Sequence, residues 1–188
     1  MTGKPDATMV FILAPSAEDR GALAATLEAY RQAMAILDET KGANLVALHE
    51  EAYEEIRLKT GLPSRMATLA LRDHSRRQPG VPIDDIPLDS KLFAVKGPDS
   101  VSIATIDGRV VMPYSVSGYR GGWDDFAEAR LVFDGPSLRI DVGVQASVHP
   151  QKETPMSNEG ILARLGRVIA GVVNNAVDTA EASNPTAV

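Results

Sequence analysis

A run of cations near the middle of the chain is the first feature whose chemistry suggests a function. Positions 57–77 hold a single acid, Asp73, among six basic residues: Arg57, Lys59, Arg65, Arg72, Arg76 and Arg77. On a helix, spacings of seven and four place Arg65, Arg72 and Arg76 on one face. Guanidinium groups bind phosphate through two parallel hydrogen bonds, so such a row can follow a nucleic-acid backbone. The alternative is an ordinary solvated helix face.

A glycine-rich segment, GYRGGWDD at positions 118–125, carries the second candidate group. Tyr119, Arg120 and Trp123 combine aromatic rings with a guanidinium group, and such side chains stack on unpaired bases. The alternative is that Trp123 and Phe126 fill one end of a barrel. The glycine spacing matches neither a phosphate-binding loop nor a dinucleotide-binding motif.

Residues suited to catalysis or metal binding are sparse. The chain has no cysteine, which excludes disulfides, thiolate metal sites and a cysteine nucleophile. Its three histidines are His49, His74 and His149. They are too far apart to form a metal-ligand motif, and the sequence has no serine-nucleophile elbow. The acids Asp84, Asp85 and Asp89 lie in a stretch without a partner motif. We therefore expect no enzymatic activity, no metal and no cofactor.

The overall charge argues against nucleic-acid binding. The net charge is −6 and the isoelectric point is about 5.1, whereas typical nucleic-acid binders are basic. Four glutamates precede the cationic run and would repel a phosphate backbone on their own face: Glu50, Glu51, Glu54 and Glu55. A local basic patch can still bind phosphate, because the nearest charges dominate the contact.

Size and composition place the chain among globular proteins. Its 188 residues can form one domain with a core, and its 44% hydrophobic and 23% charged residues are close to the globular average. No stretch approaches the roughly 20 apolar residues of a membrane span. The apolar run at 9–14 is too short for a secretory signal. We expect a bacterial-type cytoplasmic protein that does not bind membranes.

Three helices are predicted after a first strand at residues 8–14. Ser16 suits an N-cap, and a stripe with helical spacing follows it: Leu23, Leu27, Tyr30, Met34 and Leu37. A second helix is expected to begin near Asn44 and to stop at Gly61. Ser64 is expected to cap a third helix over residues 65–77, and the proline-containing stretch 78–89 is predicted to be a loop.

The chain then changes to β-branched, partly alternating segments. Strands are predicted at 91–95, 100–106, 109–115, 129–133 and 138–148, with hairpin turns at Asp107-Gly108 and Asp134-Gly135. The first strand needs a partner and is expected to join this later sheet. The predicted fold is therefore α+β: a small β-barrel from 8–14 and 90–150, with a helical segment at 16–78 inserted after its first strand.

A last helix is predicted over residues 156–182. Two neighbouring apolar stripes between Ile161 and Ala176 indicate that it either covers the sheet or pairs with another chain. Residues 183–188 are expected to fray.

Several of these segments resemble the N-terminal portion of TnpB, the RNA-guided nuclease family of IS200/IS605-type transposons and relative of Cas12 effectors. The similar segments are SAEDRGALAATLEAYRQAMAILD at 16–38, YEEIR at 53–57, GLPS at 61–64, VSIATIDGRVVMPY at 101–114, and 131–144. The resemblance covers roughly residues 8–150. It implies a wedge-like or OB-like barrel with an inserted recognition segment that holds guide RNA and helps to grip target DNA.

The chain departs from that family beyond the barrel, where neither the aspartate motif of a RuvC-like nuclease nor zinc-ribbon cysteines follow. The resemblance therefore implies a nuclease-inactive, RNA- or DNA-binding accessory or regulatory protein of transposon or CRISPR-associated origin. Two alternatives remain open. One is a protein-interaction module that binds a partner, such as a full-length nuclease, through its acidic surface or C-terminal helix. The other is a decayed transposase fragment.

Overall fold

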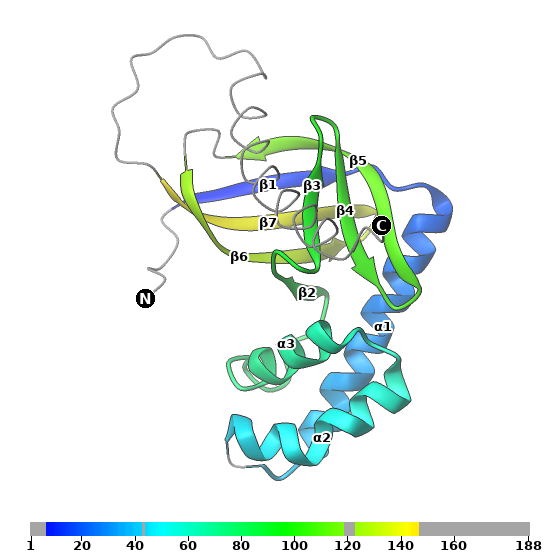
Figure 1. Cartoon of the computed structure of the whole chain (residues 1–188), viewed down its shortest axis with the longest axis vertical. Helices are drawn as coiled ribbons and strands as arrows, with labels where there is room; N and C mark the ends of the chain where they lie inside the picture. Colours follow the sequence, from blue (N-terminus) through cyan, green and yellow to red (C-terminus); the bar gives the residue numbers. More distant parts are fainter. Residues whose placement is uncertain (1–6, 43, 119–122, 147–188) are drawn as a thin grey trace, which may run out of the picture.

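The computed structural model describes residues 7–42, 44–118 and 123–146, which form an α+β fold (Figure 1). Its sheet is a curled antiparallel half-barrel of seven strands in the order β2-β6-β7-β1-β5-β4-β3. The strands are β1 (Ala7–Leu13), β2 (Asp85–Leu88), β3 (Phe93–Lys96), β4 (Ser100–Thr105), β5 (Gly108–Gly118), β6 (Trp123–Asp134) and β7 (Ser137–Ala146). OB-like or wedge identity stays a prediction, and the predicted helix at 156–182 and tail at 183–188 lie outside the described residues.

The first strand joins the later sheet, as the sequence predicted. β1 lies between β5 and β7, where Phe11 is opposite Val116 on one side and Ile140 on the other. Both hairpin turns are also confirmed, because Thr105 pairs with Gly108 and Asp134 pairs with Ser137. The chain therefore leaves the middle of the sheet after β1 and returns to it only after three helices.

These helices lie together at one end of the sheet (Figure 1). They are α1 (Ala17–Glu39), α2 (Leu45–Thr60) and α3 (Ser64–His74). Ser16 accepts a hydrogen bond from the Asp19 amide, so its predicted role as an N-cap is confirmed. The second helix begins after Asn44, near where it was expected, and the Asn44 side chain caps it by accepting from two amides of α2. Gly61 ends α2 with a φ of 68°, the left-handed conformation that favours glycine.

The prediction for the third helix was wrong at both ends. Ser64 is already helical, Pro63 is the N-cap, and no side chain caps this end. The helix stops at His74 rather than Arg77, because the amides of Arg76 and Arg77 both bond to the Asp73 carbonyl in a closing turn. Arg76, which helical spacing had placed on one face with Arg65 and Arg72, therefore lies beyond the end of the helix.

The segment expected to be a loop at 78–89 contains a strand. β2 pairs with residues 129–132 of β6, so the sheet includes residues before the predicted boundary at 90. Pro87 is tolerated because β2 is a short edge strand, where a missing ladder hydrogen bond costs little. This strand matters for the site because it faces α3.

One hydrophobic core joins the helices to the inner face of the sheet. All five residues of the predicted α1 stripe are buried. The hydroxyl of Thr26 on α1 accepts a hydrogen bond from the Ile106 amide in the β4–β5 turn, which fixes the helix against the sheet. Among the described residues, no helix is long and apolar enough to cross a membrane.

Candidate functional site

A buried charge network joins the helices to the sheet. It consists of Tyr30 on α1, Asp73 on α3, Arg77, Asp85 on β2 and Arg130 on β6. Arg77 and Arg130 each donate hydrogen bonds to both aspartates, so two cations and two anions neutralise one another. Arg130 Nη2 lies 2.9 Å and 3.1 Å from the two oxygens of Asp73, and Arg77 Nη2 lies 2.9 Å from one of them.

Asp73 is the centre of this network, because it is only 8% exposed and accepts from three side chains. Burial alone would raise its pKa, but the hydrogen bonds from Arg130 and Arg77 outweigh burial and hold the pKa below its ordinary value. Burial also raises the pKa of Tyr30, and the neighbouring Asp73 carboxylate raises it further. Asp73 is therefore an anion and Tyr30 a neutral donor across the physiological range.

Sequence reasoning missed most of this network. Asp73 appeared only as the single acid of the cationic run, Asp85 as a loop acid, and Arg130 was not singled out. The spacing of four between Asp73 and Arg77 is the one local signal for a pair. Asp73 and Arg130 are 57 positions apart, so their sequence spacing gives no such signal.

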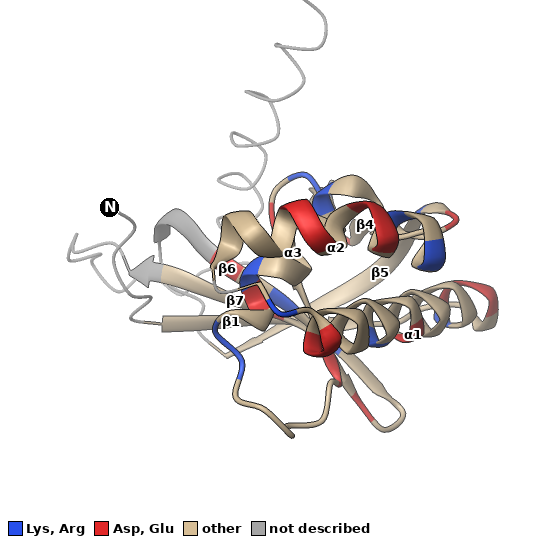
Figure 2. Cartoon of the chain, turned by 90° about the horizontal axis from the view of Figure 1, so that it is seen from below, with Lys and Arg blue, Asp and Glu red and all other residues tan. Residues whose placement is uncertain are grey.

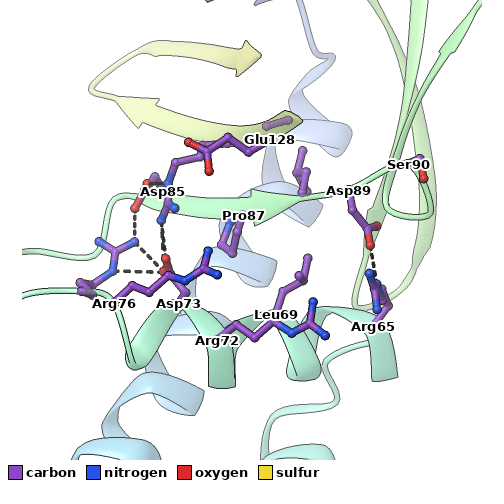
Figure 3. Close-up of a pocket in the computed structure, with 14 residues that line it drawn as sticks. Arg65, Leu69, Arg72, Asp73, Arg76, Asp85, Pro87, Asp89, Ser90 and Glu128 are labelled. Carbon is purple, nitrogen blue, oxygen red and sulfur yellow. Dashed lines mark hydrogen bonds and ion pairs between the residues drawn. The ribbon is translucent and has the colours of Figure 1, made fainter. Parts of the chain in front are cut away.

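A groove lies between α3 and β2, next to the network (Figure 3). Its volume is about 720 Å³. Its lining includes Arg65, Leu69, Arg72 and Arg76 on the helix side, and Pro87, Asp89 and Glu128 on the sheet side. We call this the α3–β2 groove. In total five arginines and four acids line it, a formal charge of +1.

The structure places four of the six predicted phosphate-binding cations in internal interactions. Arg77 belongs to the buried network and its side chain is 14% exposed. Arg65 pairs with Asp89 at one end of the groove. Arg57 donates to the Leu62 carbonyl just beyond its own helix, and Lys59 pairs with Glu55 one turn away. Each of these cations already has a partner that a phosphate would have to replace.

Arg72 and Arg76 differ from the other four. Both are exposed on the groove, and neither side chain forms a hydrogen bond or ion pair with any residue in the described ranges. Arg72 lies in the last turn of α3, Arg76 lies in the closing turn just after it, and Figure 3 shows both on the α3 side of the groove. Of the aromatic group, Tyr119 and Arg120 lie outside the described residues, and Trp123 is placed only as the first residue of β6.

The histidines of the described chain form no metal site. His49 stacks on Tyr53 with ring centroids 4.5 Å apart, and His74 contacts Asp38 at 3.0 Å. Within the described residues, no group of three or more acids and histidines could hold a metal ion. His149 lies outside that part of the chain.

The outer face of α2 is acidic (Figure 2). Its exposed glutamates are Glu50, Glu51, Glu54 and Glu55. Leu58 follows them and is 83% exposed, the largest exposed fraction among the large hydrophobic side chains described. The opposite face of this helix packs on the core through Leu48, Ala52 and Ile56. The molecule therefore presents a cationic pair at the C-terminal end of α3 and an anionic face on α2.

No model of a known protein family matches this sequence, and a search of curated proteins finds no match. The resemblance to the TnpB family remains a prediction that rests on the motifs quoted above.

Proposed function

We propose that this chain is a non-catalytic nucleic-acid-binding module whose α3–β2 groove takes the phosphate backbone. The observation that carries the proposal is the exposed pair Arg72 and Arg76, whose charges have no partner in the described part of the chain. Two exposed guanidinium groups on the same side of a groove suit contacts to a polyanion. This is the RNA- or DNA-binding role that the TnpB resemblance implies. Of the six cations in the run at 57–77, only Arg72 and Arg76 are proposed to contact phosphate.

The small number of contacts leads to a weak, salt-sensitive interaction. Each phosphate contact releases counterions and contributes about 0.7 to the slope of log affinity against log salt for a single strand. Two contacts therefore predict a slope of about −1.4. The test is fluorescence anisotropy of labelled RNA and DNA oligonucleotides with the full chain over a salt series. Incubation with magnesium or manganese should leave the same oligonucleotides uncut.

A matched pair of double variants separates the groove from general charge. Arg72→Ala with Arg76→Ala should abolish the salt-dependent binding. The control combines Arg20→Ala with Lys41→Ala, which removes the same charge from exposed positions outside the groove and should leave the slope near its wild-type value. Circular dichroism checks that both variants are folded. Equal weakening by both pairs, or no binding by the wild type at low salt, would reject the proposal.

Protein binding is a second candidate function, favoured by the exposed Leu58 among the glutamates of α2. An exposed apolar side chain that follows a run of glutamates on one helix suits a partner with a cationic, partly apolar surface. Affinity capture from the host with wild type and Leu58→Asp tests it. A basic protein retained by the wild type and lost from the variant would support this function, and identical captures would reject it.

A further inference from the structure

The two walls of the α3–β2 groove differ in charge. On the helix wall, Arg72 and Arg76 have no partner among the described residues. On the sheet wall, Asp85 is neutralised by the buried network and Asp89 by Arg65. Glu128 of β6 is exposed and lines the groove, and its side chain forms no hydrogen bond or ion pair with a described residue. The groove therefore has unpaired cations on one side and an unpaired anion on the other.

The rest of the groove's surface near these charges is partly apolar. Leu69 lies between Arg65 and Arg72 on the helix wall, and Pro87 lies on the sheet wall (Figure 3). Both are half-buried, so they leave some apolar surface open to a ligand. Unpaired bases contact apolar and aromatic side chains through their faces, whereas paired bases inside a duplex keep those faces stacked.

We infer that the α3–β2 groove selects single-stranded over double-stranded nucleic acid, with Glu128 as the discriminating residue. This inference rests on the proposed function. A single strand can place phosphates on Arg72 and Arg76 while it turns its bases toward Pro87 and Leu69. A duplex carries phosphates on two backbones, so seating it in the same groove brings phosphate toward Glu128. Like charges placed together in this way disfavour the wrong partner.

The experiment compares one strand with its own duplex. Labelled 12-nucleotide DNA, its RNA equivalent and the matching duplex are titrated with the full chain at one low salt concentration. We expect the wild type to prefer the single strands by about tenfold. Glu128→Gln should narrow this preference to within about threefold, mainly by tighter duplex binding, because it removes the repelling charge and keeps the side chain's size.

Glu50→Gln is the matched control, because it removes one exposed charge from α2 outside the groove. It should leave the preference for single strands unchanged. Neither Glu128 nor Glu50 has a partner in the described chain, so neither change should affect folding, which circular dichroism checks.

The outcomes separate this inference from the proposed function. Failure to bind either form rejects the proposed function and the inference with it. Equal or tighter binding of the duplex rejects the inference and leaves nucleic-acid binding intact. An unchanged preference in folded Glu128→Gln, or the same change in Glu50→Gln, rejects the role of Glu128. If a poly-glutamate peptide displaced the oligonucleotide as effectively as unlabelled nucleic acid did, the groove would bind acidic polypeptides. That result would overturn both the proposed function and the inference.

Discussion

Arg130 on β6 donates hydrogen bonds to both carboxylate oxygens of Asp73 on α3, at 2.9 Å and 3.1 Å. The same arginine also pairs with Asp85 on β2. One side chain thus joins the sheet to the helical segment that follows β1. Arg77, which follows α3, pairs with the same two aspartates. The interface between the helices and the sheet is therefore held by ion pairs as well as by the hydrophobic core.

Removing Arg130 should destabilise the fold strongly. Arg130→Met leaves two buried or half-buried aspartates sharing one cation, and breaking a buried pair in this way costs about 3–5 kcal/mol. Arg139→Met is the control, since Arg139 forms only partly exposed pairs with Asp134 and Asp141 in the same hairpin, with an expected cost of about 0–1 kcal/mol. Urea unfolding measures both. Similar losses in the two variants would show that the network does not hold the interface.

Stability should fall in acid partly through Asp73. Its folded-state pKa is lowered, so its contribution is fully present above the unfolded-state pKa of about 3.9. That contribution is lost as the pH falls through the lower folded-state pKa. The gap in unfolding free energy between wild type and Asp73→Asn should therefore be largest near neutral pH and shrink below about pH 4. Denaturant unfolding from pH 7 to pH 2 tests this, and a constant gap would contradict it.

Alanine substitutions at the N-terminal ends of α2 and α3 should differ in their effect on stability. Asn44→Ala removes the side-chain acceptor for two amides of α2 and should cost about 1 kcal/mol. Ser64→Ala should change the unfolding free energy by less than about 0.5 kcal/mol, because Ser64 is already helical and caps nothing. Thermal or urea unfolding of both variants measures the difference. If Ser64→Ala lowered the unfolding free energy by about 1 kcal/mol, Ser64 would act as the N-cap that the sequence predicted.

Two glycine substitutions should act in opposite directions. Gly61 ends α2 at a φ of 68°, so Gly61→Ala should destabilise the protein by about 1 kcal/mol. Gly21 is an exposed position inside α1, and a Cβ added there meets no atom within 4 Å. Gly21→Ala should stabilise by about 0.5–1 kcal/mol through helix propensity. Changes of the same sign at both positions would be inconsistent with these backbone conformations.

The sequence by itself determined part of the local structure and the buried face of α1. Ser16 and Asn44 cap their helices, Asp107-Gly108 and Asp134-Gly135 turn their hairpins, and the α1 stripe is buried. These outcomes depend on residues within a few positions of one another, where spacing alone fixes geometry. The sequence also predicted that the first strand joins the later sheet, because an isolated strand leaves its backbone hydrogen-bonding groups unsatisfied.

Only the tertiary structure decided which arginines are open to a ligand. Helical spacing placed Arg65, Arg72 and Arg76 on one face, but it carried no information about Asp89 or about the turn that carries Arg77 to Asp73. Strand β2 was not predicted because it is stabilised by pairing with residues of β6 that lie 41 to 47 positions further along the chain, rather than by its own composition. Ion pairs form between groups that folding brings within about 4 Å, whatever their separation along the chain. An arginine therefore forms an internal ion pair if the fold places a carboxylate beside it. It stays exposed to a ligand if the fold does not.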